Sequence, residues 1–259
     1  MQAKPSLSTK FHSFEEYALA EYSQGLDGKN ASQLMFMYRR AMEKSSPVIL
    51  ELGTAKGQAT TVFLQACEET LGRLVSVDIV DCSDISDSSK WQFLQSNSLN
   101  VGFILSKAPY LKDGIDILYI DSKHSRSHVE KELTSWYPYM NERSWIFFDD
   151  VDSNPYRKGN RKDDATAEVN WDEIHEYVKS FFYANEDSLY LDIMYGSTGL
   201  ACLYKLSSKG TTPSKARPIV HRKKNIWRRG RNWAAFLARC VWRTLPFTRA
   251  AASSIKFRF

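Results

Sequence analysis

Three aspartates and a histidine follow two apolar runs of the sequence, at positions where their side chains could do chemistry. Asp121 and His124 follow one run, and Asp149 and Asp150 follow the next. Crowded carboxylates repel one another unless a cation joins them or one of them takes a proton. Hard divalent cations prefer oxygen ligands, and a neighbouring imidazole can accept a proton near neutral pH. The group therefore indicates cation-assisted proton transfer, although the aspartates could instead cap helices and His124 could be an ordinary surface residue.

A second group surrounds the loop that follows an earlier apolar run. The segment VILELGTAKG places Glu51 near the end of that run, with Gly53 and Gly57 in the loop. Gly53 permits a turn that a side chain would block and lets a ligand lie against the backbone. Asp78 ends the next run, where a carboxylate can accept hydrogen bonds from both hydroxyls of a ribose. The pattern favours a nucleoside site; the alternative is that Gly53 only makes a turn and Asp78 caps a helix.

These side chains need a scaffold that brings the ends of successive strands together. From about residue 30 to 205, short apolar runs alternate with helix-like segments, which predicts an α/β fold with a mainly parallel, seven-stranded sheet. A late antiparallel hairpin is expected around the glycine-containing turn 195–199. The expected strands are Val48–Leu52, Leu74–Val80, Val101–Leu105, Ile115–Ile120, Trp145–Phe148, Ser188–Ile193 and Leu200–Tyr204. The expected helices are Asn30–Lys44, Thr60–Thr70, Ser127–Tyr137 and Trp171–Phe182.

The charge distribution divides the chain into an N-terminal helical cap (1–44), a central domain (45–206) and a basic linker and tail (207–259). The tail holds 14 lysines and arginines and no acidic residue, whereas the rest of the chain is acidic. On a helix over residues 226–245, an apolar stripe would lie opposite several arginines. Such a basic amphipathic helix is typical of binding in the plane of an anionic membrane. It could also dock on the acidic domain or on a partner glycosyltransferase; nucleic acid is not expected, because it would not explain the apolar stripe.

The composition excludes several classes of protein. Apolar residues make up 43% and charged residues 25% of the 259 residues, which excludes a long disordered or collagen-like chain. We find no apolar run of about 18 residues that could span a bilayer and no secretory signal. The four cysteines are widely spaced, which favours a reducing compartment and a cytoplasmic location.

Four short motifs occur in an order that resembles a known family. They are Glu-Leu-Gly-Thr, Val-Asp, Tyr-Ile-Asp-x-x-His-Ser and Phe-Phe-Asp-Asp-Val, within roughly residues 45–152. The set is similar to the class I S-adenosylmethionine-dependent methyltransferases, in the branch of cephalosporin-hydroxylase-like proteins and macrolide-sugar O-methyltransferases. The resemblance implies a Rossmann-like sheet and S-adenosylmethionine as cofactor. It implies contacts to that cofactor from Glu51, Gly53, Thr54, Gly57, Asp78 and Asp121.

The resemblance also implies roles for the residues near the hydroxyl that receives the methyl group. Asp121, Asp149 and Asp150 would bind Mg²⁺, and His124 would be the base. The chain departs from its relatives at Ala55, where a glycine is usual, at Ser122-Lys123, where Gly-Asp is frequent, and at Asp149, which is shorter than the glutamate of some metal-dependent members. A nicotinamide dinucleotide site is the competing interpretation of the first loop, but it requires a glycine at position 55 and no acid beside its pyrophosphate.

The expected function is therefore methylation of a sugar hydroxyl in a bacterial surface polysaccharide or its lipid-linked precursor. The enzyme would act on the inner face of the cell membrane, with the tail on the anionic surface. A nonenzymatic nucleoside-binding module and a nucleic-acid methyltransferase stay open. His128, one helical turn after His124, is expected to be a solvated helix residue. A basic loop over 156–162 could close over an anionic acceptor or only connect two elements.

Overall fold

The computed structural model of the chain describes residues 28–152 and 165–220. The chain divides into two compact units, Met1–Arg217 and Pro218–Phe259. The first 27 residues of the expected cap, the basic loop 156–162 and the expected tail helix 226–245 lie outside the described residues. The first unit extends past residue 206, because Gly210 N–H donates to the Pro138 carbonyl at 2.8 Å and Lys209 Nζ donates to the Asp113 carbonyl at 2.8 Å.

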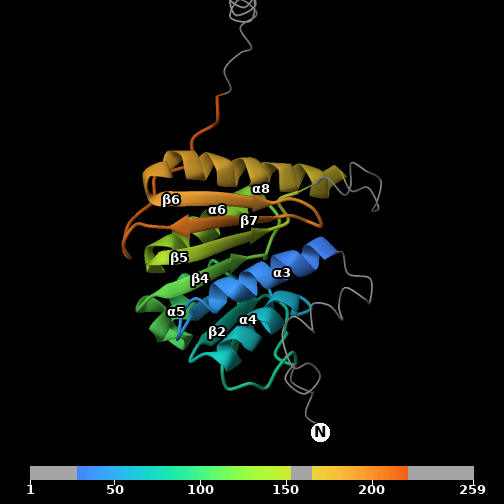
Figure 1. The fold of residues 1–259 in the computed structure, drawn as a ribbon, viewed down its shortest axis with the longest axis vertical. Helices are drawn as coiled ribbons and strands as arrows, with labels where there is room; N and C mark the ends of the chain where they lie inside the picture. The colour runs from blue at the N-terminus through green and yellow to red at the C-terminus, as the bar shows by residue number, and fades with distance from the viewer. Residues whose placement is uncertain (1–27, 153–164, 221–259) are drawn as a thin grey trace, which may run out of the picture. The chain divides into compact units, whose positions relative to one another are not determined.

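A seven-stranded sheet forms the centre of the first unit, in the order β3-β2-β1-β4-β5-β7-β6 (Figure 1). Neighbouring strands from β3 to β5 are parallel, and β7 is antiparallel to both β5 and β6. The predicted fold class, a mainly parallel sheet with a late antiparallel hairpin, is confirmed. The strands are β1 (Val48–Leu52), β2 (Arg73–Asp78), β3 (Trp91–Gln95), β4 (Ile115–Ile120), β5 (Met140–Asp149), β6 (Leu189–Met194) and β7 (Leu200–Lys205).

Helices cover both faces of the sheet. The α-helices are α3 (Gly28–Ala41), α4 (Gln58–Glu69), α5 (Val101–Lys107), α6 (Arg126–Trp136) and α8 (Ala165–Ala184), and short 3₁₀ helices span Pro109–Lys112, Tyr137–Tyr139 and Glu186–Ser188. Side chains alternate between the faces of each strand, so Ile49 and Ile117 pack with α3 and α4, whereas Leu50 and Leu118 pack with α5, α6 and α8. Both faces are therefore buried, which explains why β1 and β4 are almost continuously apolar.

The prediction for the third strand is wrong. Val101–Leu105 forms the start of α5, and the third strand is instead Trp91–Gln95. The Asn100 side chain accepts a hydrogen bond from the Phe103 N–H at 3.4 Å and so caps the helix. An apolar run of five residues fits either state, and β3 is an edge strand whose polar residues weaken its hydrophobic pattern.

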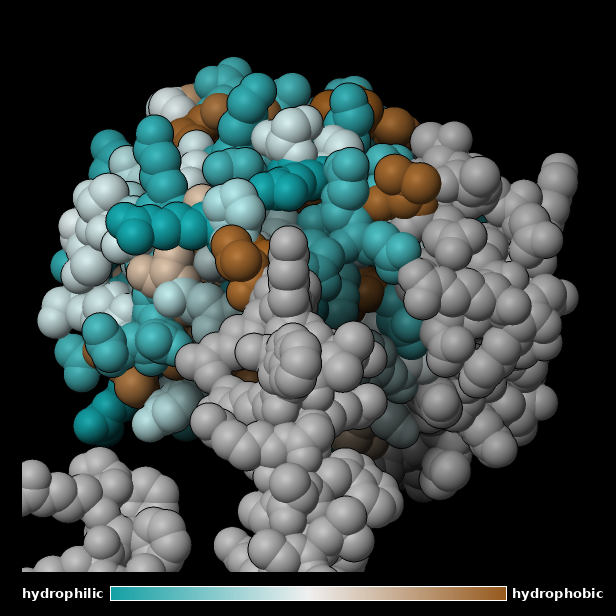
Figure 2. Space-filling view, turned by 90° about the horizontal axis from the view of Figure 1, so that it is seen from above, coloured by the Kyte–Doolittle hydropathy of each residue, from teal (hydrophilic) through white to brown (hydrophobic). Residues whose placement is uncertain are grey.

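One face of the described residues is mostly polar. In the view of Figure 2, hydrophilic residues predominate among the described atoms, and hydrophobic ones are scattered between them. Within the described ranges, no helix is both long and apolar enough to cross a membrane.

Candidate active site

The loop after β1 and the end of β4 meet closely at the carboxyl edge of the sheet. Gly53 has a φ of 96°, and its N–H donates to the Val77 carbonyl at 2.9 Å. A Cβ at Gly53 would overlap the backbone carbonyl of Asp121 and lie 2.8 Å from the Cα of Ser122. Only glycine allows this approach, so the loop that the sequence predicts as a ligand cradle is pressed against the strand that carries Asp121.

Asp78 organises the same loop from the end of β2. Its carboxylate accepts hydrogen bonds from the N–H groups of Thr54 at 2.8 Å, Ala55 at 3.1 Å and Val80 at 2.9 Å. Partial burial acts to raise the pKa of Asp78, but the backbone donors outweigh it, and the pKa lies below its ordinary value. Asp78 thus holds the loop rather than a helix end, and it does so as a carboxylate.

Glu51 is the buried acid of the first group. Its carboxylate accepts hydrogen bonds from the hydroxyl of Thr60 at 2.7 Å and from that of Ser76. The residue is 1% exposed, and burial raises its pKa to about 8 against the opposite effect of the two hydroxyls. Without a cationic partner Glu51 is therefore largely protonated at neutral pH, and a bound positive charge would favour its ionised form.

A cavity of about 240 Å³ lies between these groups. The loop after β1 forms its floor, α3 contributes apolar side chains and Gln33, and three acids together with Tyr119 complete the wall. The lining residues are Gln33, Leu34, Met37, Glu51, Gly53, Thr54, Ala55, Lys56, Gln58, Ala59, Tyr119, Asp121 and Asp149. The helix that the sequence predicts as a cap thus contributes to the cavity, and the acids give the cavity a preference for positive charge.

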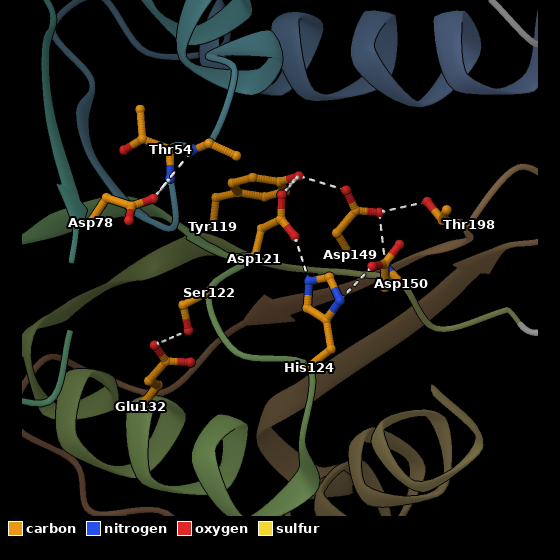
Figure 3. Close-up of polar contacts among 11 residues, drawn as sticks. Thr54, Asp78, Tyr119, Asp121, Ser122, His124, Glu132, Asp149, Asp150 and Thr198 are labelled. Atoms are coloured by element: carbon orange, nitrogen blue, oxygen red, sulfur yellow. Dashed lines mark hydrogen bonds and ion pairs between the residues drawn. The ribbon is translucent and has the colours of Figure 1, made fainter. Parts of the chain in front are cut away.

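His124 lies between two carboxylates at the next strand ends (Figure 3). Its Nε2 is 3.1 Å from Asp121 Oδ1 and its Nδ1 is 2.7 Å from Asp150 Oδ2. The hydrogen bonds to Asp121 and then to Asp150 raise the pKa of His124 to about 10. One ligand atom from each of the three residues falls within 4.8 Å of the others, so the three together could hold a metal ion. We call Asp121, His124 and Asp150 the cation group.

Asp149 belongs to the cavity and not to the cation group. Its Oδ2 accepts a 2.7 Å hydrogen bond from the Tyr119 hydroxyl, and its Oδ1 accepts bonds from the Asp150 N–H at 2.8 Å and the Thr198 hydroxyl at 3.1 Å. Burial, followed by repulsion from Asp121 and Asp150, raises the pKa of Asp149 to about 7. The Tyr119 hydroxyl also lies 3.2 Å from Asp121 Oδ2 and so connects the cavity with the cation group.

Several residues that support the site were not predicted from the sequence. Tyr119 lies inside the Tyr-Ile-Asp motif and could have been noticed there, whereas Thr198 is 49 residues from Asp149 and carries no sequence signal. The expectation for His128 is wrong. Its Nε2 lies 3.2 Å from a carboxylate oxygen of Glu132, a fully buried residue whose Oε1 also accepts a hydrogen bond from Ser122 at 2.5 Å.

Comparison with known proteins agrees with this geometry. Residues 50–151 match a protein family described as a methyltransferase domain. No curated protein matches the chain in sequence. Among solved structures, the chain resembles a Staphylococcus aureus protein assigned as a caffeoyl-CoA O-methyltransferase, with 14% identity and a TM-score of 0.53 over 76% of this chain and 94% of the other. The family match identifies a methyltransferase domain over residues 50–151, and the structural match shows a shared fold.

Two further structures share the fold. MycE methyltransferase of the mycinamycin biosynthetic pathway, solved with Mg and SAH, is 16% identical with a TM-score of 0.52, and the match covers 84% of this chain and 58% of MycE. Cofactor-bound Rv0187 from MTB is 15% identical with a TM-score of 0.51, and the match covers 80% of this chain and all of that one. Because these sequence identities are low, the comparison with solved structures shows only that the fold is similar.

Proposed function

We propose that this chain, a methyltransferase by its domain and fold, is an S-adenosylmethionine-dependent O-methyltransferase that acts on a sugar hydroxyl. The observation that carries the proposal is the position of the cation group directly beside the acid-lined cavity. The acid-lined cavity suits a positively charged methyl donor, and the cation group suits an alcohol that must lose a proton. The motif resemblance to macrolide-sugar enzymes supports the sugar, and a bacterial surface polysaccharide or its lipid-linked precursor is the proposed acceptor.

The charge of the cavity suits S-adenosylmethionine. The cofactor would supply a methyl group bound to a positively charged sulfur, and Glu51, Asp121 and Asp149 lie on the cavity wall to offset that charge. The loop of Gly53, Thr54 and Gly57 would hold the methionine part. Asp78 would accept the ribose hydroxyls from its half-buried position.

His124 is the proposed base. Both of its ring nitrogens contact carboxylates, and the raised pKa keeps the ring protonated, so the ring must release one proton and open one of the two contacts before it can accept the proton of an acceptor hydroxyl. The carboxylate that stays bound then fixes the ring and stabilises its positive charge. The protein's remaining task is to hold the methyl donor and the hydroxyl in line.

The cation group fits a divalent cation such as Mg²⁺. Asp121 and Asp150 supply hard oxygen ligands at the right spacing, and Asp149 stands next to them as a further carboxylate. A bound cation would make an acceptor hydroxyl more acidic.

Calorimetric titration of the full chain with S-adenosylhomocysteine, with and without Mg²⁺, tests the cofactor site. Transfer of labelled methyl groups from S-adenosylmethionine to sugar nucleotides, polyprenyl-phosphate-linked sugars, extracted polysaccharide and RNA then tests the acceptor class. Binding of S-adenosylhomocysteine with transfer to a sugar oxygen supports the proposal. Absence of binding contradicts it, and transfer to RNA alone would replace it with a nucleic-acid methyltransferase.

We further propose that the basic tail places the enzyme at the inner face of an anionic membrane, near a glycosyltransferase partner. Support comes from the composition of residues 207–259, which hold 14 basic and no acidic residues. Flotation with vesicles of phosphatidylglycerol and phosphatidylethanolamine at low salt should carry the full chain, whereas pure phosphatidylcholine vesicles should not. Equal recovery with both kinds of vesicle contradicts the proposal.

A further inference from the structure

The turn between β6 and β7 lies against the acidic end of β5. Because β7 runs antiparallel to β5, Leu200 pairs with Asp149, and the preceding residues reach the Asp149 side chain. There the hydroxyl of Thr198 donates to Asp149 Oδ1 at 3.1 Å. The turn therefore joins two strands and also donates a hydrogen bond to a residue of the site.

Three donors from different parts of the chain fix the Asp149 carboxylate. Besides Thr198, the hydroxyl of Tyr119 binds Oδ2 at 2.7 Å, and the N–H of Asp150 binds Oδ1 at 2.8 Å. Tyr119 is 3% exposed and cannot easily move away. The carboxylate is thus held on the wall of the cavity, next to the cation group and without a contact to His124 (Figure 3).

The turn is itself fixed from two sides. The Thr198 carbonyl accepts a hydrogen bond from the Asp152 N–H at 2.7 Å, and the Asp152 carboxylate accepts one from the Gly196 N–H at 2.7 Å. From α3, Gln33 Nε2 donates to the Gly196 carbonyl at 2.9 Å. Gly199 has a φ of 81°, and a Cβ there would lie 2.5 Å from the Cβ of Asp152. These contacts hold the turn, and with it Thr198, in a fixed position.

We propose that Thr198 is a positioning residue that holds Asp149 at the cavity wall, where its carboxylate favours cationic S-adenosylmethionine over neutral S-adenosylhomocysteine. The two ligands differ at the sulfur by one methyl group and one positive charge. A negative charge that is fixed toward the cavity therefore discriminates between them, and one that is free to turn away does so less. The inference rests on the proposed function, because it places the cofactor in this cavity.

Calorimetric titration of the full chain with both ligands tests the proposal in wild type, T198V and T198S. Valine keeps the shape of threonine and lacks the hydroxyl. T198V should weaken S-adenosylmethionine binding about tenfold, the effect of losing one hydrogen bond to a charged group, and S-adenosylhomocysteine binding by less than about twofold. T198S should retain the wild-type preference. T134V is the matched control, because Thr134 is exposed on α6 and its hydroxyl bonds to the Glu130 carbonyl of the same helix.

D149N tests the other partner of the same hydrogen bond, and as a single variant it still measures the effect of the Asp149 charge if T198V does not fold. It should reproduce the selective loss of S-adenosylmethionine binding, and adding T198V to it should cause no further loss. Equal losses for both ligands, failure of T198S to retain the preference, or additive effects of T198V and D149N overturn the inference. A wild-type chain that binds neither ligand overturns the proposed function instead, whereas wild-type binding that T198V leaves unchanged overturns only the role of Thr198.

Discussion

The Nδ1 atom of His124 lies 2.7 Å from Asp150 Oδ2, across the ends of two neighbouring strands. Asp121, on the other side of the ring, lies 3.1 Å from Nε2. In the absence of a cation, the protonated imidazole therefore takes the place of one by separating two carboxylates that would repel each other. The same ring is the proposed base, so its protonation links the stability of the site with its chemistry.

The pH dependence of unfolding should reveal this link. The pKa of His124 rises from 6.5 to about 10 on folding, so its stabilising effect is complete below pH 6.5 and is lost as the pH rises toward 10. D150N should lower the free energy of unfolding more at pH 6 than at pH 10, measured by urea denaturation without divalent cations. D187N, at an exposed aspartate, is the control and should show no such difference. An equal effect of D150N at both pH values contradicts the prediction.

Removal of the His124 ring should slow methyl transfer and leave cofactor binding nearly unchanged. H124A should keep the affinity for S-adenosylhomocysteine within a few-fold, because the ring does not line the cavity. Methyl transfer should fall by about 10²- to 10⁴-fold, the usual contribution of a positioned base. Calorimetry and a labelled-methyl assay on the same preparation measure the two quantities. If H124A transferred methyl groups at the wild-type rate, another base would have to act.

Gly53 should be intolerant of substitution. G53A places a Cβ against the backbone of Asp121 and Ser122 in a left-handed conformation, so it should destabilise the protein by more than about 2 kcal/mol and abolish cofactor binding. G102A is the matched control, because nothing lies within 4 Å of a Cβ at Gly102, in the first turn of α5. There alanine should not destabilise the protein. Thermal unfolding of the two variants measures the contrast, and similar melting temperatures would contradict it.

The sequence predicted the parts of the site that depend on short-range patterns. Apolar runs bounded by turns located the ends of β1 and β4, and those of β2 and β5 to within two residues, and parallel pairing then brings those ends to one edge. The prediction failed for β3, where an edge strand has little hydrophobic signal. It also could not find Thr198, because a contact across 49 residues depends on the register of β5 with β7. His128 was missed for the same reason, since its partner Ser98 follows a different strand.

Glu51 should make stability fall as the pH rises. Its pKa increases from 4.5 to about 8 on folding, so the folded state binds the proton more tightly, and stability declines between these two pH values. E51Q cannot ionise and should remove this decline. Between pH 4.5 and pH 8.5, the wild type should therefore lose on the order of several kcal/mol more of its free energy of unfolding than E51Q does. Urea denaturation of both proteins across this range measures the difference. Parallel stability curves would show that Glu51 stays ionised in the folded protein.

The Tyr119 hydroxyl should set the protonation of the acids on both sides of it. It lies 2.7 Å from Asp149 and 3.2 Å from Asp121, and its hydrogen bonds lower the pKa of each carboxyl group against the effect of burial. Y119F removes the donor, so both pKa values should rise, and the acid side of the pH–rate profile should move to higher pH. Loss of a buried donor should also cost about 1–3 kcal/mol of stability. Y190F, at a tyrosine that is 65% exposed, should leave the profile and the stability unchanged. An unshifted profile in Y119F would mean that the acids of the site titrate without help from this hydroxyl.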